Sequence, residues 1–201
     1  MIAVLDYGIG NLRSAEKALQ KVGGAAHLVT SAEEAAGANG VVLPGVGNFG
    51  RCIEAVRASG LDRVAVAAVE AGTPFLGICV GMQMLYEGSE EAPGVKGLGV
   101  LKGTNRLLPD DVKRPQMQWN VLEPRRQGSA LLNGLDGDTW MYFVHSYAAA
   151  VSDDVVATCD YGGPVVAAVE RDNVWATQFH PEKSGESGMR LLRNFVEKCA
   201  V

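Results

Sequence analysis

Apolar and polar positions along this chain change period several times, from the continuous runs of buried strands to the spacing of helices. Residues 2–5 form a short apolar run, and beyond a glycine-rich turn Leu12, Ala15, Leu19 and Val22 recur at helical spacing. This opening predicts a strand, a loop and a helix. Continuous apolar runs predict further strands at residues 27–29, 41–43, 75–78, 141–144, 155–158, 165–169 and 174–178. Helical spacing predicts helices at residues 51–58, 62–70, 80–86 and 188–198.

Strands that are apolar throughout, rather than at every second position, indicate a sheet that is covered on both faces. We therefore predict the α/β class, with an open, mostly parallel sheet between two layers of helices. Residues 89–138 hold more glycine, proline and charge, and no element is assigned to them. A length of 201 residues, without an internal repeat or linker, predicts a single domain at residues 1–201.

Charge and composition argue against several classes of function. The formal net charge is -5 and no basic run is present, which disfavours nucleic acid or an anionic membrane surface as the main partner. No apolar run approaches the roughly 20 residues that span a bilayer, and the N-terminus lacks a charged segment and a cleavage site, so a cytoplasmic protein is expected. Four cysteines without a CxxC pair and three scattered histidines predict neither a disulfide framework nor a metal site.

One cysteine stands where a strand is predicted to turn into a helix. Gly77-Ile78-Cys79-Val80-Gly81 begins within a predicted strand, and such a turn pushes its central side chain outward as a nucleophile elbow. Small neighbours leave room for a substrate carbonyl to approach the sulfur. Cys79 is therefore a candidate nucleophile, although free cysteines are often simply buried, which is our interpretation of Cys52, Cys159 and Cys199.

A candidate base and its orienting group lie much later in the chain. His180 and Glu182 follow the strand predicted at residues 174–178. In an open α/β sheet the site lies outside the carboxyl ends of the strands, where Pro44-Gly45-Val46-Gly47 also falls. Glycines there would let backbone N–H groups face a developing oxyanion, although such a segment in isolation is also typical of a plain turn. A cysteine and a histidine that meet only in space match the needs of a cysteine nucleophile.

Several segments of the chain carry a family resemblance. They are residues 6–12, 44–47, 77–83, 115–117, 143–147 and 180–184. Together they resemble the class-I, triad-type glutamine amidotransferases, and most narrowly the glutaminase subunits of imidazole glycerol phosphate synthases. The resemblance covers essentially the whole chain, with Gln118 standing where that subfamily usually has glycine. It implies a flavodoxin-like α/β fold and no cofactor.

The resemblance implies a role for each matching residue. Cys79 would attack the carboxamide of glutamine, His180 would protonate the departing ammonia, and Glu182 would orient the histidine. The oxyanion hole would consist of the backbone N–H groups of Val46 and Val80. Glutamine would contact Gly45, Gly47, Gln83, His145, Ser146 and Tyr147. The side chain of Gln83, taken alone, is also typical of a helix surface.

A glutaminase of this kind needs a synthase beside it, because free ammonia is protonated in neutral water. The chain has no phosphate-binding P-loop and no complete dinucleotide fingerprint. The resemblance implies a heterodimer with a (β/α)8-barrel cyclase of histidine biosynthesis, which makes imidazole glycerol phosphate and aminoimidazole carboxamide ribonucleotide. Trp119, Asn120, Tyr142 and Lys183 would lie at the interface near the ammonia passage. Tyr142 also fits an ordinary core strand, and Lys183 an ordinary solvated lysine.

Two other functions stay open at this point. One is a glutaminase that serves a different synthase, such as the one that makes pyridoxal phosphate; residues 6–12 and 143–147 disfavour it. The other is a non-amidotransferase with a cysteine elbow, acting as a redox sensor, a chaperone or a silent regulatory subunit. The presence of Cys79, His180 and Glu182 together disfavours a silent protein.

Overall fold

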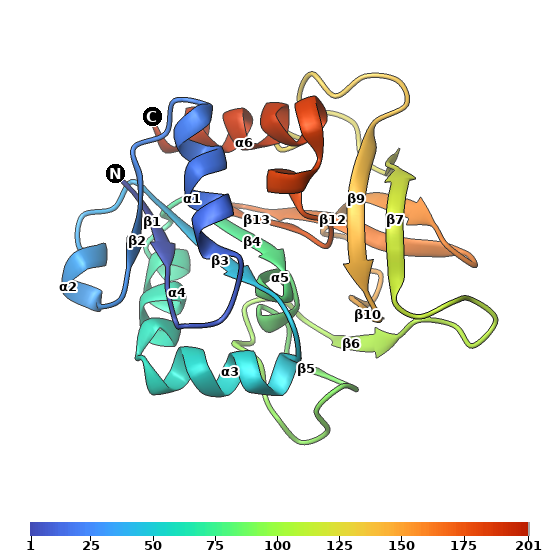
Figure 1. Ribbon diagram of the computed structural model, residues 1–201, viewed down its shortest axis with the longest axis horizontal. Helices are drawn as coiled ribbons and strands as arrows, with labels where there is room; N and C mark the ends of the chain where they lie inside the picture. Colours follow the sequence, from blue (N-terminus) through green and yellow to red (C-terminus); the bar gives the residue numbers. More distant parts are fainter. Residues whose placement is uncertain (201) are drawn as a thin grey trace.

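The computed structural model describes residues 1–200; residue 201, the last of the predicted domain, lies outside the described residues. Its largest feature is an eight-stranded sheet in the order β2-β1-β3-β4-β13-β12-β11-β8 (Figure 1). The strands of this sheet are β1 (Ile2–Leu5), β2 (Ala26–Val29), β3 (Gly40–Gly45), β4 (Phe75–Cys79), β8 (Glu123–Pro124), β11 (Val155–Asp160), β12 (Pro164–Arg171) and β13 (Val174–Thr177).

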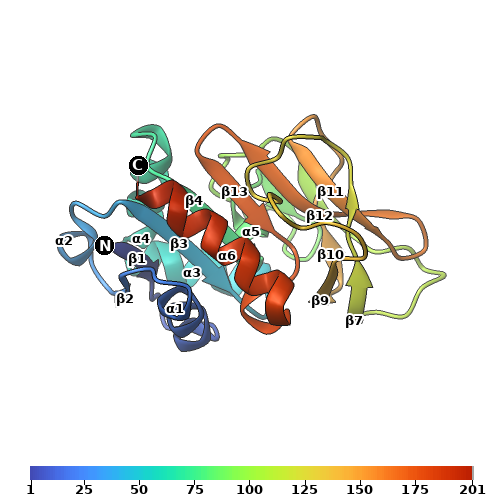
Figure 2. The same ribbon diagram turned by 90° about the horizontal axis from the view of Figure 1, so that it is seen from above.

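The half of the sheet from β2 to β13 is parallel throughout. Every residue of β1, β3, β4 and β13 is buried, as their unbroken apolar runs predict. Figure 2 shows α1 (Leu12–Lys21) and α6 (Gly185–Cys199) on one side of these strands and α3 (Phe49–Ala58) and α4 (Leu61–Glu70) on the other. The predicted α/β class, with helices on both faces of the sheet, is therefore confirmed. The chain also forms the short helices α2 (Ala32–Ala35) and α5 (Val80–Met84), with a 3-10 turn η1 (Pro181–Lys183).

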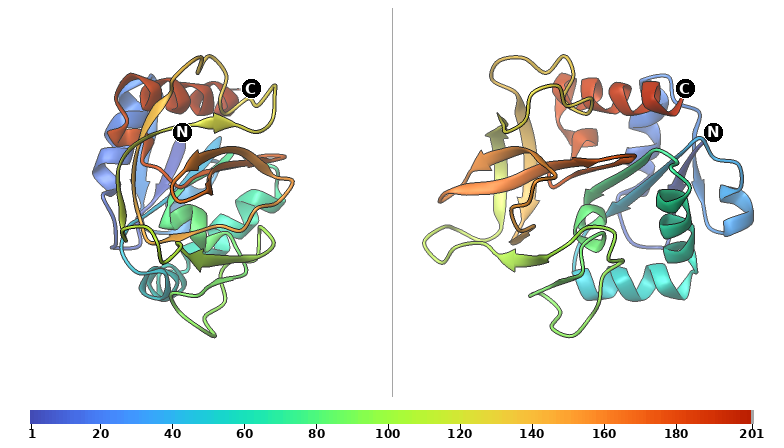
Figure 3. Two further views of the ribbon diagram at one scale, coloured as in Figure 1. Left: turned by 90° about the vertical axis from the view of Figure 1, so that its right-hand side faces the viewer. Right: turned by 180° about the vertical axis from the view of Figure 1, so that it is seen from behind.

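The other half of the sheet is antiparallel, from β13 through β12 and β11 to β8. Two smaller sheets accompany it. The first is an antiparallel ribbon of β7 (Gln116–Val121) and β9 (Trp140–His145), and the second joins β5 (Gly88–Ser89), β6 (Thr104–Leu107) and β10 (Tyr147–Ala148). The ribbon stands at the end of the molecule away from α2 (Figure 3). Strands β6 and β7 lie within residues 89–138, to which the apolar pattern assigns no element.

The ends of the elements differ from the predicted ones by a few residues where a local contact extends or stops them. Helix α3 begins at Phe49 rather than residue 51, because Asn48 caps it by accepting a hydrogen bond from the backbone N–H of Arg51. Strand β13 stops at Thr177, so Gln178 lies beyond it. No helix within residues 1–200 is both long and apolar enough to cross a membrane.

Candidate active site

Cys79 is the last residue of β4 and comes immediately before α5. Its backbone has φ 55° and ψ −113°, a positive φ that residues with a side chain rarely adopt. A Cβ added at Gly81 would lie 1.8 Å from the Leu43 carbonyl oxygen, and one at Gly77 would lie 3.1 Å from the Gly81 oxygen. The elbow is therefore present as predicted. The flanking glycines let the turn pack against its own strand and against β3.

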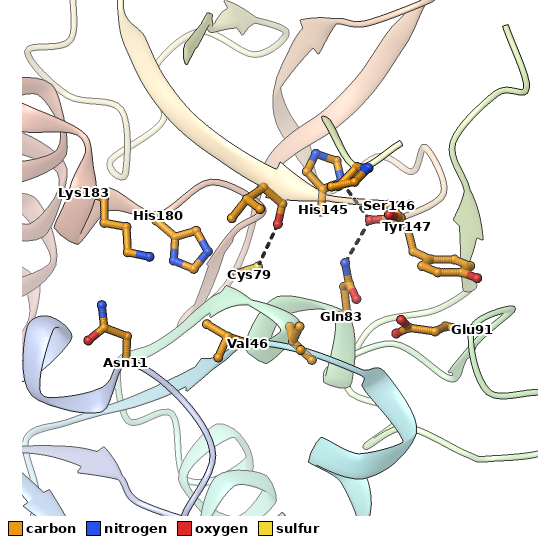
Figure 4. Close-up of a pocket in the computed structure, with 14 residues that line it drawn as sticks. Asn11, Val46, Cys79, Gln83, Glu91, His145, Ser146, Tyr147, His180 and Lys183 are labelled. Carbon is orange, nitrogen blue, oxygen red and sulfur yellow. Dashed lines mark hydrogen bonds between the residues drawn. The ribbon is translucent and has the colours of Figure 1, made fainter. Parts of the chain in front are cut away.

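A cavity of about 410 Å³ opens beside the Cys79 sulfur, at the carboxyl ends of β3, β4 and β13. Figure 4 shows the side chains that surround it. Most of the predicted site residues line this cavity: Val46, Gly47, Cys79, Val80, Gln83, His145, Ser146, Tyr147, His180 and Lys183. The convergence that the sheet topology predicts is therefore present. Gly45, Glu182, Trp119, Asn120 and Tyr142 are not in the cavity wall.

His180 and Glu182 form a buried pair behind the cavity. The imidazole Nδ1 lies 2.7 Å from a Glu182 carboxylate oxygen, and both side chains are almost completely buried. Burial lowers the pKa of His180, but the neighbouring Cys79 and Glu182 outweigh it and raise this pKa above its ordinary value. The imidazole Nε2 has no hydrogen-bond partner among residues 1–200. This nitrogen is therefore free to give or take a proton at the cavity.

Backbone contacts tie the histidine to the ribbon. The His180 N–H donates to the Tyr142 carbonyl oxygen over 3.0 Å. The Ser184 hydroxyl accepts from the Tyr142 N–H over 3.0 Å and donates to the His180 carbonyl oxygen over 2.6 Å. The position of His180 thus depends on β9 as well as on β13.

The segment after β3 approaches the elbow from the opposite side. Gly45 pairs with Cys79 across the sheet, and a Cβ at Gly45 would lie 2.8 Å from both the Gly81 nitrogen and the Tyr7 hydroxyl. Gly45 therefore acts in packing, while the next residues, Val46 and Gly47, reach the cavity. The Tyr7 hydroxyl donates to the Pro44 carbonyl oxygen over 2.7 Å, and burial raises the pKa of this hydroxyl.

Amide and imidazole groups hold the far wall of the cavity in place. The Gln83 side-chain nitrogen donates to the Tyr147 carbonyl oxygen over 2.9 Å and to the Gln178 side-chain oxygen over 3.0 Å. His145 Nδ1 lies 2.9 Å from the same Tyr147 oxygen, and Nε2 lies 3.0 Å from Gln116. Burial lowers the pKa of His145 to about 4, against the raising effect of the Tyr147 carbonyl. His145 is therefore a neutral structural group at pH 7.

Four residues that were not predicted as site residues also line the cavity: Asn11, Glu91, Pro115 and Val144. Asn11, Pro115 and Val144 lie in segments that carry the family resemblance, so a signal for them was present. Glu91 lies in the stretch without a predicted element. One of its carboxylate oxygens accepts from the Phe49 N–H over 2.7 Å, which fixes the carboxylate beside the N-terminus of α3.

The outer face of the ribbon is apolar and exposed. Trp119 on β7 lies opposite Tyr142 on β9, and their rings meet edge to face with centroids 6.1 Å apart. Trp119 is 47% exposed and Met117 on the same face 65% exposed. Asn120 does not join them, since its side-chain nitrogen donates to the Asp160 carbonyl oxygen on β11 over 2.9 Å. Gln118, at the position where the subfamily usually has glycine, is an exposed strand residue.

Lys183 is the one predicted interface residue in the cavity wall. It follows Glu182 in η1, so it lies between the cavity and the groove that separates α1 from α6. Residues 1–200 contain no cluster of three or more histidine, cysteine, aspartate or glutamate side chains that could hold a metal ion.

Comparisons with known proteins find relatives along the whole chain. A family model described as "Glutamine amidotransferase class-I" matches residues 3–199. The "Imidazole glycerol phosphate synthase subunit HisH" of Bacillus cereus (strain G9842) is 48% identical over 197 residues, which cover 97% of this chain and 93% of that protein. A protein of the same name from Methanothermobacter thermautotrophicus is 48% identical over 198 residues, with 98% of each chain covered.

A solved structure is similar in fold at lower sequence identity. It is described as "Crystal structure of glutamine amidotransferase" and has a TM-score of 0.78 at 24% identity. The match covers 100% of this chain and 99% of that chain. The similarity supports the order of elements and the layered sheet.

Proposed function

Since the chain belongs to the class-I glutamine amidotransferase family, we propose that it is the glutaminase subunit of an imidazole glycerol phosphate synthase. Its relatives of that name are 44% to 48% identical over nearly their full length. One observation carries the chemistry: an elbow cysteine and a buried histidine–glutamate pair meet at a single cavity. The similarity of this site to a cysteine–histidine–carboxylate triad supports hydrolysis of the glutamine side chain.

The first half of the reaction forms a thioester. The Cys79 thiolate attacks the side-chain carbonyl carbon of glutamine, and charge develops on the carbonyl oxygen. The N–H groups of Val46 and Val80 donate to that oxygen; the Val80 N–H is available because it is the first of α5 and has no partner within the helix. The His180 imidazolium then gives its proton to the departing amino group. Ammonia leaves, and the imidazole becomes neutral.

The second half regenerates the enzyme. Neutral His180 takes a proton from a water molecule through Nε2, and the resulting hydroxide attacks the thioester carbon. The carbon–sulfur bond breaks, glutamate leaves, and Cys79 is again a thiolate beside a protonated imidazole. Glu182 holds the ring through Nδ1 and favours its charged form throughout.

The charges of the cavity suit an amino acid substrate. The Glu91 carboxylate supplies an acceptor for the α-ammonium group of glutamine. Both hydrogens of the Gln83 amide are already donated, to Tyr147 and Gln178, so its oxygen is the group left for a ligand. Gly47 and the backbone of residues 145–147 complete the wall that faces the substrate.

The partner is proposed to be a (β/α)8-barrel cyclase that forms a heterodimer with this chain. The exposed apolar face of the ribbon, with Trp119 and Tyr142, supports a protein contact there, since aromatic side chains are enriched at interfaces. Lys183 lines the cavity, and we expect it to lie beside the route by which ammonia leaves. Asn120 would act on this interface indirectly, because its side-chain nitrogen ties the ribbon to the Asp160 carbonyl oxygen on β11.

Two further expectations concern the whole chain. One hydrophobic core includes residues from β1 through α6, which supports one domain over residues 1–201. All four cysteines are free thiols, which fits a reducing compartment such as the cytoplasm.

The test is glutamate release from L-glutamine by the purified protein, alone and with a cyclase and its nucleotide ligand. Turnover that rises with the cyclase and disappears in Cys79→Ala supports both the chemistry and the partnership. Turnover that is the same with and without the cyclase contradicts the partnership but keeps the glutaminase. Turnover that survives in Cys79→Ala contradicts the thiol mechanism.

A further inference from the structure

Besides His180, two polar groups lie close to the Cys79 sulfur, and they act in opposite directions. The Val144 carbonyl oxygen lies 4.0 Å away and can only accept, so it disfavours a negative sulfur. The Gln178 side-chain nitrogen lies 3.7 Å away and can donate. Gln178 is completely buried and lies just beyond β13. Its amide is thus the neutral group at the sulfur that favours the thiolate.

The orientation of the Gln178 amide follows from the groups that surround it. A carbonyl oxygen can only accept, so the Gln83 amide must turn its nitrogen toward Tyr147. The same nitrogen then donates its second hydrogen to Gln178, which must present its oxygen to Gln83. The nitrogen of Gln178 is left facing the sulfur. A backbone carbonyl thus determines, through two amides, which end of Gln178 meets the nucleophile.

We propose that the Gln178 side-chain amide is a catalytic hydrogen-bond donor to the Cys79 thiolate, and that Gln83 and the Tyr147 carbonyl fix its orientation. This inference rests on the proposed function, in which Cys79 is the nucleophile. His180 gives up its proton to the departing ammonia and is neutral when water attacks the thioester. Gln178 keeps its hydrogens, so it supports the sulfur both before the first attack and when the thiolate leaves.

Other titratable groups surround this sulfur and contribute to its charge state. His180 and Glu182 approach it from the segment after β13, Tyr7 from the turn after β1, and Cys52 from α3. Glu91, His145 and Lys183 line the cavity that it faces. Among residues 1–200, the hydrogen bonds of the Gln178 amide go to Gln83 and Cys79 and to none of these charged groups, so a change of this side chain leaves their hydrogen bonds in place.

The experiment measures the alkylation rate of Cys79 by iodoacetamide as a function of pH, with peptide mass spectrometry to read this cysteine alone. Gln178→Leu removes the donor, and we expect the alkylation rate of Cys79 near neutral pH to fall about tenfold. Gln178→Glu keeps the size and the acceptor toward Gln83 but places a carboxylate at the sulfur. We expect the alkylation rate of Cys79 near neutral pH to fall about a hundredfold in this variant.

Asn194→Leu is the matched control. Asn194 carries a buried amide on α6 that donates to the Leu131 and Asn133 carbonyl oxygens and does not line the cavity. We expect the Cys79 profile to be unchanged in this variant. If Gln178→Glu shows the same alkylation profile of Cys79 as the parent protein, the proposal is overturned. Gln178→Glu has the size of the original side chain, so it decides the question alone if Gln178→Leu does not fold. Alkylation does not require glutamine as a substrate, so it tests the donor role separately from the proposed function. If the parent protein has no glutaminase activity but the Gln178 variants still shift the alkylation profile, the donor role stands and the proposed function is contradicted.

Discussion

The parallel half of the sheet and the β7-β9 ribbon contribute to the same cavity in different ways. The parallel half supplies Val46, Cys79 and His180 from the ends of strands that are buried along their whole length. The ribbon supplies Val144 and His145 from a pair of strands whose outer face meets solvent. Close packing holds the reacting groups, and the exposed strands hold the wall that a partner can reach.

The difference shows how one small protein holds its catalytic groups rigidly and also keeps an exposed surface for a partner. Catalysis needs donors fixed to within fractions of an ångström, which interior strands provide. A two-stranded ribbon is only marginally stable by itself, so it relies on its neighbours. Here the Tyr142 backbone accepts a hydrogen bond from the His180 N–H and donates one to the Ser184 hydroxyl. These two hydrogen bonds join the ribbon to the segment that carries His180. The variants below test each side of this division.

Removal of the nucleophile should have the largest effect. Cys79→Ala eliminates the attacking sulfur, and we expect glutamate release to fall by at least about 10⁴-fold, as in other triad enzymes. Cys199→Ala is the control, because this buried cysteine packs against Gly40 and lies away from the cavity. A similar loss in both variants would point to damaged folding rather than to lost chemistry.

The packing of the elbow can be tested with one methyl group. In Gly81→Ala the added Cβ would lie 1.8 Å from the Leu43 backbone oxygen, which cannot move without displacing β3. We expect the free energy of unfolding in urea to fall by about 3 kcal/mol. In Gly88→Ala the nearest atom is 3.5 Å away, an ordinary contact, and the fall should stay below about 1 kcal/mol. Equal effects would contradict close packing as the reason for glycine.

The two buried histidines should contribute opposite pH dependences to the free energy of unfolding. His145 has a folded pKa of about 4, below its ordinary 6.5, so the unfolded chain binds more protons between these values. Stability should therefore fall by about 2 kcal/mol from pH 7 to pH 5, and His145→Gln should flatten that slope. His27→Gln, an exposed residue on β2, is the control and should leave the slope as it is.

His180 should act in the alkaline direction. Its folded pKa is raised by Cys79 and Glu182 against the effect of burial, so its contribution is complete below the ordinary value of 6.5. The contribution is lost as the pH rises through the folded pKa. Glu182→Gln removes one of the charges that raise it, so the decline of the urea-unfolding free energy from pH 7 to pH 9 should be smaller in this variant. An unchanged decline would contradict the coupling.

The ribbon variant should leave the isolated subunit almost unaffected. Trp119→Ala removes an exposed indole, and we expect the Kd for the cyclase to rise by about 30-fold, the effect of a 2 kcal/mol interface residue. Basal glutamate release should not change. Val151→Ala, 72% exposed and outside the ribbon, is the control and should bind normally. Normal binding by Trp119→Ala would place the partner elsewhere.

The sequence allowed prediction of the parallel half because the signals there are local. An unbroken apolar run marks a strand buried on both faces, and glycines beside a cysteine mark the elbow. The ribbon could not be predicted in the same way. In β7, Gln116 is buried against His145 while Met117 and Trp119 are exposed, so polarity and burial are inverted. Only the distant partner strand explains that pattern.

The same reason explains the site residues that were not predicted. The apolar pattern places Gln178 at the end of the strand predicted at residues 174–178, whereas its contact with Cys79 joins two residues that are far apart in sequence. Glu91 lies in the stretch without apolar periodicity and is fixed by the N-terminus of α3. Such roles depend on which groups the fold brings together, and periodicity carries no information about that.

The positive φ of Cys79 gives the smallest of the expected effects. Glycine adopts such a conformation freely, whereas alanine and cysteine do not. Cys79→Gly should therefore be more resistant to urea than Cys79→Ala by about 1 kcal/mol, with both variants inactive. Equal unfolding free energies would show that the turn is relaxed.

This turn has a consequence for how the protein can evolve. In a lineage that no longer needs the reaction, glycine at position 79 relieves the unfavourable backbone conformation, so the turn itself favours loss of the nucleophile. Only continued selection for the chemistry keeps a side chain there. A library screened for thermal resistance alone should accumulate the same replacement, and the nucleophile should be among the first residues to disappear.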